Sequence, residues 1–164
     1  IATIPATMAP VENPWPVTQG HVAIQNIDDI VRTTFFDCDA ICYNIKNRRI
    51  RATEDYLARL RARTIDINLL ANPSIEGNLL RAIRRILTWG FKPGPTLRKF
   101  IGNHLEDNIM PVLARTEASL YPIGVIARFD SAAELKAMLF SRRPEILFTT
   151  SASEQLQLPG FADD

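Results

Sequence analysis

The apolar spacing of residues 72–90 constrains the fold of this chain more than any other feature of the sequence. Apolar residues recur there at intervals of three and four, as they do on the buried face of a helix: Ile75, Leu79, Ile83, Ile86 and Leu87. Asn72-Pro73 is typical of a helix start, and Gly90 is typical of a residue that ends a helix. We therefore predict a long amphipathic helix between them, whose apolar face must be covered by other elements.

The charge of the chain is unevenly distributed around this helix. Residues 46–99 hold thirteen basic and four acidic side chains, a formal charge of +9, whereas residues 1–45 and 100–164 each carry −4. The net charge of +1 hides this acidic–basic–acidic order. The order favours binding to a polyanion, or head-to-tail association of identical copies.

Composition limits the class of protein. With 164 residues and 46% hydrophobic content, the chain is long enough for one domain with its own core. Charged residues make up 23%, close to the average for folded proteins, which argues against wholesale disorder. Arginine outnumbers lysine by fifteen to four. The planar fork of arginine suits phosphate and carboxylate partners, although a GC-rich coding bias explains the same excess.

Proline and helix signals divide the chain into a body and two ends. Residues 1–20 contain four prolines and no helical period, so we expect an extended N-terminal arm lying on another surface. Residues 151–164 are polar, and we expect an extended C-terminal tail. The predicted fold class is mainly α: a single core domain over residues 21–150 with four to five helices, and at most a small β element near residues 123–150.

The first predicted helix of the body begins at Asn26, a residue type that caps helix starts. Its apolar residues repeat at three and four as far as Ile45, which indicates one buried face. Cys38 and Cys42 lie four apart on that face, and we interpret them as core thiols rather than metal ligands because no further ligands lie near them in sequence.

Further helices are predicted after the first. One begins at Thr53 and turns Tyr56, Leu57 and Leu60 inward; its arginines alternate at positions 59, 61 and 63 and so spread around the helix. Another begins at Pro95, and its buried residues are expected to be Leu97, Phe100, Ile101 and Leu105. Pro111 is expected to kink or end it.

The last part of the body is predicted to hold a helix between two short apolar runs. Ser131 has a glutamate three residues later, which is the pattern of a capping box and indicates a helix start. The flanking runs, residues 125–129 and 145–150, are candidate strands that would make a minimal βαβ unit.

No motif for catalysis or for a cofactor is present. The two histidines, His21 and His104, lie outside any HExxH pattern, and there is no GxSxG, Walker-type or Rossmann-type glycine pattern. We therefore expect no enzyme, no catalytic residue, no metal and no cofactor. A small helical enzyme with a scattered site is kept as the second alternative to the function given below. No apolar run approaches eighteen residues, so no membrane span is expected.

Nucleic-acid binding is better supported than catalysis. A strongly basic segment can follow a phosphate backbone, and no helix-turn-helix, zinc finger or aromatic RNP motif is present for reading bases. This favours sequence-independent contact with single-stranded RNA. Arg98 and Lys99 stand in the first turn of a predicted helix, where cations are unfavourable unless an anion lies nearby; that anion is either a ligand or an acidic neighbour in the fold.

Three short segments stand out: Pro95-Thr96-Leu97-Arg98-Lys99-Phe100, Tyr121-Pro122-Ile123-Gly124 and Arg128-Phe129-Asp130. They resemble segments in the coat proteins of flexible filamentous plant viruses of the potyvirus and potexvirus type. The resemblance implies a helical body with extended arms that join subunits. It also implies that Arg98 and Asp130 form a pair beside an RNA groove.

Together these patterns predict an RNA-binding coat or nucleocapsid-type protein that self-assembles into helical filaments through its N- and C-terminal arms. The expected phosphate contacts, with Asp130 added from the resemblance, are Arg84, Arg85, Arg98, Lys99 and Arg115, followed by Arg48, Arg49 and Arg51. Such a protein would be found in the virion and the host cytoplasm, and otherwise in a soluble, reducing intracellular compartment. The first alternative to this function is a non-enzymatic structural subunit of a larger protein assembly.

Overall fold

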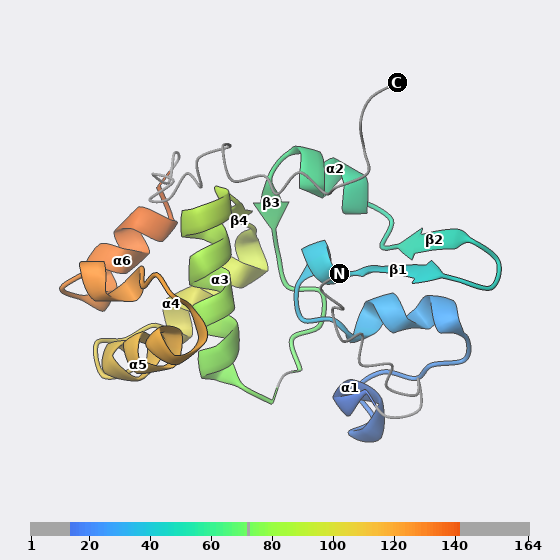
Figure 1. The fold of residues 1–164 in the computed structure, drawn as a ribbon, viewed down its shortest axis with the longest axis horizontal. Helices are drawn as coiled ribbons and strands as arrows, with labels where there is room; N and C mark the ends of the chain where they lie inside the picture. Colours follow the sequence, from blue (N-terminus) through green and yellow to red (C-terminus); the bar gives the residue numbers. More distant parts are fainter. Residues whose placement is uncertain (1–13, 72, 142–164) are drawn as a thin grey trace.

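The computed structural model describes residues 14–71 and 73–141, and about half of these residues are helical, so the mainly α prediction is confirmed. Helices α3–α6 gather on one side of the molecule and shorter elements on the other (Figure 1). The elements of the N-terminal half are α1 (Trp15–Thr18), the 3-10 helices η1 (Ile27–Thr33) and η2 (Asp37–Asp39), β1 (Ile41–Asn44), β2 (Arg49–Ala52), α2 (Tyr56–Arg61) and β3 (Thr64–Ile65).

The C-terminal half is organised around its first and longest helix. Its elements are α3 (Ile75–Trp89), β4 (Lys92–Pro93), α4 (Pro95–His104), α5 (Met110–Leu120), the 3-10 helix η3 (Ile126–Arg128) and α6 (Ala132–Leu139). The side chain of Ser74, not Asn72-Pro73, caps α3, accepting a hydrogen bond from the N–H of Gly77 at 2.9 Å. Gly90 ends the helix in the left-handed conformation, with φ of 69°.

The core surrounds the apolar face of α3. Side chains from four helices are fully buried there: Leu79, Ile83, Ile86 and Leu87 of α3, Leu97 and Ile101 of α4, Leu113 of α5, and Leu135 and Leu139 of α6. The predicted face of α3 is therefore confirmed, except for Ile75 in its first turn, which is 41% exposed. Burying each such side chain stabilises the fold by roughly 1.5–3 kcal/mol.

Backbone pairing attaches the N-terminal half to this core. The strands β3 and β4 form a two-stranded parallel sheet in which Ile65 lies opposite Pro93. An isolated bridge joins Phe36 to Ile67, and the N–H of Asp66 donates to the carboxylate of Asp37 at 2.9 Å. Residues 64–67 therefore lie between the two halves and hydrogen-bond to both.

The continuous helix predicted for residues 26–45 is wrong. The cap at Asn26 is present, but it opens only the short helix η1. Residues 41–52 instead form the antiparallel hairpin β1–β2. In its turn, the Oδ1 atom of Asn44 accepts hydrogen bonds from the N–H groups two and three residues later, which satisfies the backbone without a helix.

Two further predictions for the N-terminal half fail with it. Cys38 lies in η2 and Cys42 in β1, so the two thiols share no helix face, although Cys38 does pack against the core. In α2, Tyr56 is half-buried as expected, but Leu57 and Leu60 are 60% and 41% exposed. The helix is too short to hold a buried face against a neighbour.

The helix predicted from Pro95 is confirmed as α4. Its expected inward residues are buried: Leu97, Phe100 and Ile101, with Leu105 directly after the helix. Pro111 does not end this helix, because α4 already ends at His104; it lies instead in the first turn of α5, where proline is tolerated.

The last expectations about the fold have mixed outcomes. Ser131 caps α6 as predicted, accepting from the N–H of Glu134, whereas residues 125–129 form η3 and no strand. In the part of the chain that the structure describes, the β elements lie at residues 41–52, 64–65 and 92–93, not near residues 123–150. The run 145–150, the tail 151–164 and residues 1–13 of the arm lie outside the described residues; residues 15–18, expected to be extended, form the helix α1.

Candidate nucleic-acid interface

The basic side chains of residues 46–99 fall into two groups. In the first, the cation contacts a carboxylate: Arg51 with Asp28, Arg59 with Asp37, Arg84 with Glu117 and Arg85 with Asp39. In the second, the side chain is exposed and has no carboxylate partner within residues 14–71 and 73–141: Lys46, Arg48, Arg49, Arg61, Arg63, Arg81, Lys92, Arg98 and Lys99. Only the second group offers charge to a ligand without breaking an ion pair between described residues.

Arg84 holds three segments of the C-terminal half together. Its Nη1 atom donates to Oε1 of Glu117 at 2.6 Å and to the carbonyl of Ile123 at 2.8 Å, and its guanidinium lies 3.8 Å from the centre of the Tyr121 ring. Glu117 is 1% exposed, and its other oxygen accepts from the N–H groups of residues 125 and 126, both at 2.9 Å. Arg84 therefore neutralises a buried carboxylate that in turn orders the loop after α5.

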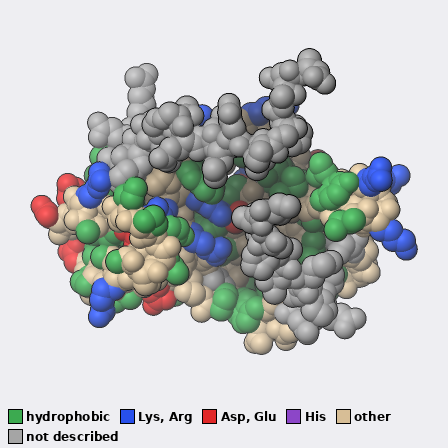
Figure 2. All heavy atoms as spheres, viewed as in Figure 1, with side chains coloured by type: hydrophobic (Ala, Val, Ile, Leu, Met, Phe, Trp, Pro, Cys, Tyr) green, Lys and Arg blue, Asp and Glu red, His purple; other side chains and the backbone are tan. Residues whose placement is uncertain are grey.

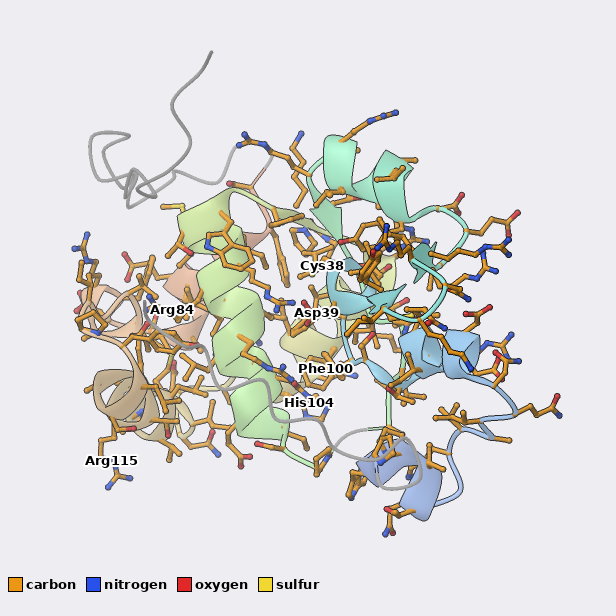
Figure 3. All side chains as sticks on the ribbon, turned by 45° about the vertical axis from the view of Figure 1, so that its right-hand side comes forward. Cys38, Asp39, Arg84, Phe100, His104 and Arg115 are labelled. Atoms are coloured by element: carbon orange, nitrogen blue, oxygen red, sulfur yellow. The ribbon has the colours of Figure 1, made fainter. Side chains whose placement is uncertain are left out.

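Arg85 connects the two halves of the molecule. It donates to Asp39 at 2.9 Å and to the sulfur of Cys38 at 3.0 Å, and it lies over the Phe36 ring at 4.6 Å. Figure 3 shows Cys38 and Asp39 in the N-terminal half, beside α3. Burial raises the pKa of the Cys38 thiol from 9.0 to about 12, and the nearby Arg85 only partly offsets this. The thiol is therefore protonated at neutral pH and unsuited to nucleophilic or metal chemistry.

The remaining arginine on this side of α3 is Arg81. It is exposed, and its contacts are with neutral groups, the amide oxygen of Asn78 and the Phe36 ring at 5.3 Å. The arginines of α3 line a small hollow of about 180 Å³ together with Trp89 and Tyr121. Lysine and arginine side chains are visible near the middle of the face drawn in Figure 2.

Exposed cations gather where β3 pairs with β4. We call the basic edge the set Arg61, Arg63, Lys92, Arg98 and Lys99, all of which are exposed. The N–H of Lys92 donates to the carbonyl of Arg63 at 2.7 Å, which brings the end of α2 beside β4. Because β4 leads directly into α4, Arg98 and Lys99 follow in the first turns of this helix. The contact between Lys92 and Arg63 thus joins segments 29 positions apart in sequence, and Arg61, Arg98 and Lys99 are added by continuity of the chain.

A buried carboxylate already occupies the N-terminus of α4. The Oδ1 atom of Asp66 accepts hydrogen bonds from the N–H of Leu97 at 2.7 Å and from the N–H of Ile67 at 2.9 Å. Asp66 is 8% exposed, and the anion expected beside Arg98 and Lys99 is therefore this acidic neighbour in the fold. The cations themselves remain on the surface and do not surround an open anion site at the helix end.

The hairpin presents a second basic surface. Arg48 and Arg49 are exposed at its turn, whereas Arg51 donates from Nε to Asp28 at 2.7 Å. The hairpin also exposes four large apolar side chains, between 43% and 74%: Ile41, Tyr43, Ile45 and Ile50. Tyr43 lies opposite Ile50 in the strand register, so this apolar surface spans both strands.

Arg115 and Asp130 belong to neither of these surfaces, and Arg98 does not pair with Asp130. Arg115 is exposed on α5, donates only to the carbonyl of Pro111 among its described contacts, and points away from the body in Figure 3. Arg98 lies 4.5 Å from the centre of the Phe140 ring, and the N–H of Asp130 donates to Glu134. Within the described residues, Arg98 and Asp130 form no ion pair.

Sequence reasoning missed Arg61, Arg63 and Lys92 as site residues. Arg61 and Arg63 were expected to spread around a helix, but α2 ends at Arg61, and Arg63 follows it in a left-handed conformation with φ of 49°. Their proximity to Lys92 depends on a parallel pairing of only two residues per strand, which leaves no periodic signal in the sequence.

The described residues contain no group of three or more His, Cys, Asp or Glu side chains placed to hold a metal ion. None of the described helices is both long enough and apolar enough to cross a membrane. Comparison with protein-family models, curated proteins and solved structures finds no match to this chain.

Proposed function

We propose that this chain is a single-stranded RNA-binding protein of the coat or nucleocapsid type, which assembles with its own copies into filaments. The observation that carries the proposal is the basic edge: five exposed cations without a carboxylate partner in the described part of the chain. Such a surface neutralises phosphates without reading bases, and the counterions that it releases drive the association.

Two arginines that have no carboxylate partner among the described residues also carry backbone strain, which supports a role for their charge. Arg48 and Arg63 have φ values of 54° and 49°, in the left-handed region that glycine or asparagine adopts more easily. A non-glycine residue there costs about 1–2 kcal/mol. Arginine at these two positions therefore lowers the stability of the fold, and it places a charged side chain on an exposed turn.

The interface is therefore assigned differently from the prediction made on sequence alone. Arg98 and Lys99 remain as proposed phosphate contacts in the basic edge, and Arg48 and Arg49 remain as a second contact at the hairpin turn. The arginines with internal carboxylate partners, Arg51, Arg84 and Arg85, are assigned to holding the fold. Arg115 and Asp130 receive no role in this interface.

Self-assembly is supported by the apolar surface of the hairpin. Several large apolar side chains exposed on one small element are typical of a protein–protein contact. The same observation favours the alternative function, a structural subunit of a larger protein assembly. The two functions differ in whether polyanion binding is strong and dependent on salt.

The test is RNA affinity as a function of salt, together with particle morphology. Fluorescence anisotropy of a labelled oligouridylate between 50 and 200 mM salt is expected to give a slope of log K against log salt of about −3.5 from the five cations of the basic edge, at about −0.7 for each phosphate. The slope is expected to reach about −5 when Arg48 and Arg49 contact phosphates as well. Electron microscopy is expected to show filaments that absorb at 260 nm as nucleoprotein. A monodisperse monomer with weak, salt-insensitive RNA binding would refute the proposal.

A further inference from the structure

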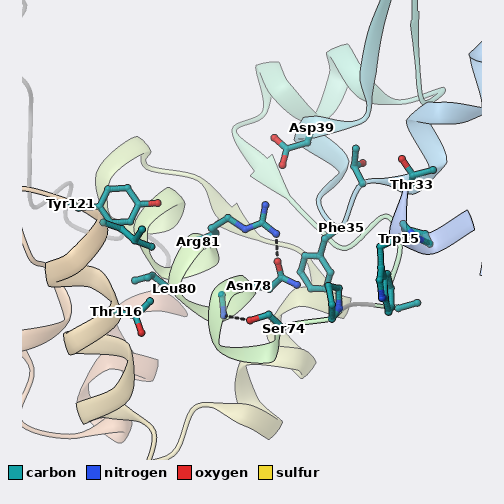
Figure 4. A pocket seen from close by; sticks show the side chains of 16 residues that line it. Trp15, Thr33, Phe35, Asp39, Ser74, Asn78, Leu80, Arg81, Thr116 and Tyr121 are labelled. Atoms are coloured by element: carbon teal, nitrogen blue, oxygen red, sulfur yellow. Dashed lines mark hydrogen bonds between the residues drawn. The ribbon is translucent and has the colours of Figure 1, made fainter. Parts of the chain in front are cut away.

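A second cavity lies next to the arginines of α3 and is not used by the basic edge. Its volume is about 580 Å³, within the range of small-molecule sites. Most of its wall is apolar, with Trp15 of α1, Phe35, Leu80 of α3 and Tyr121 after α5 among the lining residues. Figure 4 shows Asn78 and Arg81 side by side on α3 within this lining.

Asn78 is a buried polar side chain whose amide nitrogen has no hydrogen-bond partner among the described residues. It is 1% exposed, and its Oδ1 atom accepts from Nη2 of Arg81. A guanidinium has only donors, so this contact fixes which amide atom is the oxygen. The Nδ2 atom then has no acceptor in the described part of the chain. An unmet buried donor costs about 1–3 kcal/mol, which an acceptor from a ligand would recover.

The two charged side chains among the described lining residues, Asp39 and Arg81, differ in their partners. Asp39 lines the cavity, but Arg85 neutralises it at 2.9 Å. Arg81 has only the neutral partners Asn78 and Phe36 among the described residues, so part of its planar fork is available. A fitting ligand therefore supplies acceptor oxygens and a negative charge from one end, and a flat apolar body from the other.

We propose that this cavity binds a small aromatic carboxylate. The carboxylate forks onto the guanidinium of Arg81 and places one oxygen toward Nδ2 of Asn78, while the ring lies against Phe35 and Trp15. A carboxylate suits the site because it is planar and presents two oxygens to two adjacent donor groups. The site uses neither the basic edge nor the hairpin, so it does not depend on the proposed RNA binding.

The test is titration of ¹⁵N-labelled protein with 2-naphthoate, followed by NMR. The side-chain NH₂ resonances of Asn78 and the Nε–H of Arg81 are expected to shift and saturate. The uncharged analogue 2-naphthalenemethanol is expected to bind at least tenfold more weakly. Equal binding of the two compounds, or saturation without a shift at Asn78, would overturn the proposal.

Two variants distinguish 2-naphthoate binding in this cavity from non-specific binding elsewhere on the protein. Asn78→Leu and Arg81→Met are each expected to weaken 2-naphthoate about tenfold or more, since each removes a donor to a charged group. The matched control Arg115→Met leaves the affinity unchanged. If both cavity variants bind as the native protein does, or if oligouridylate displaces 2-naphthoate from Asn78, the cavity is no aromatic-carboxylate site. A failure of RNA binding would leave the expected 2-naphthoate result unaltered.

Discussion

The arginines of α3 and the cations of the basic edge look alike in sequence and differ in what surrounds them. The side chains of Arg84 and Arg85 are 17% and 14% exposed and contact carboxylates that lie 33 and 46 positions away along the chain. Those of the basic edge are exposed, with no carboxylate partner among the described residues. The basic segment therefore contains two populations of cations. The positions of acids far away in sequence decide which cations stabilise the fold and which are available to bind a ligand.

The largest effect is expected from breaking the paired population. Arg84→Ala leaves the carboxylate of Glu117 buried without its partner, and the free energy of unfolding is expected to fall by about 3–5 kcal/mol. Urea denaturation measures this loss. Arg61→Ala, on the exposed surface, is the control and should change stability by no more than about 0.5 kcal/mol. Similar losses in both variants would remove the distinction between the two populations.

A smaller effect tests how the basic edge is held in place. At Gly94 an added Cβ would lie well inside van der Waals contact with the carboxylate of Asp66, which caps α4. Gly94→Ala is therefore expected to cost about 1–3 kcal/mol in thermal or chemical unfolding. Gly102, in the same helix, has open space around its Cβ position, and Gly102→Ala should gain about 0.5–1 kcal/mol. A neutral Gly94→Ala would show that Asp66 does not constrain this connection.

Arg63 allows stability and binding to be separated at one residue. Arg63→Gly relieves a left-handed conformation but adds freedom to the unfolded chain, so a net gain of about 0.5 kcal/mol is expected. The same change removes one phosphate contact and should reduce the salt slope of RNA binding by about 0.7. Calorimetry and anisotropy measure the two quantities. Unchanged RNA binding would exclude Arg63 from the interface.

The last effect appears only at alkaline pH and concerns the junction between the halves. The pKa of Cys38 is about 12 in the folded protein against 9.0 ordinarily, so the folded state retains a proton that the unfolded state loses. Its contribution to stability is complete below pH 9 and declines as pH rises from 9 toward 12. Cys38→Ala should therefore show a shallower fall in urea midpoint between pH 9 and 11 than the native protein. Parallel curves would contradict the burial of this thiol.

The regular helices could be predicted from sequence because their signals are local. Each signal depends only on residues close by in sequence: the apolar period of α3, the proline at the start of α4 and the serine cap of α6. The hairpin was missed although Ile41, Tyr43 and Ile45 alternate along it, because Cys38, Cys42 and Ile45 also fit the helical spacing of three and four. What decides against the helix is the set of side-chain bonds that Asn44 makes in the turn, together with pairing across the two strands.

The candidate site was predicted less well than the fold for the same reason. Sequence identified Arg98 and Lys99, because cations in a first helical turn are a local anomaly. It could not reveal that Arg84 lies against Glu117, or that Arg63 lies beside Lys92, since both depend on tertiary contacts. Asp66 explains the anomaly at α4, because its carboxylate accepts a hydrogen bond from the N–H of Leu97. It lies 31 residues before Leu97 in the chain.

The most direct measurement compares the salt slope of RNA binding between two variants with the same loss of charge. One is Arg61→Gln/Arg63→Gln/Lys92→Gln in the basic edge; the other is Arg32→Gln/Arg115→Gln/Lys136→Gln elsewhere on the surface. We expect a slope smaller by about 2 for the first, at about 0.7 per lost contact, and an almost unchanged slope for the second. Equal slopes in the two variants would show that net charge alone governs binding and would contradict an interface at the basic edge.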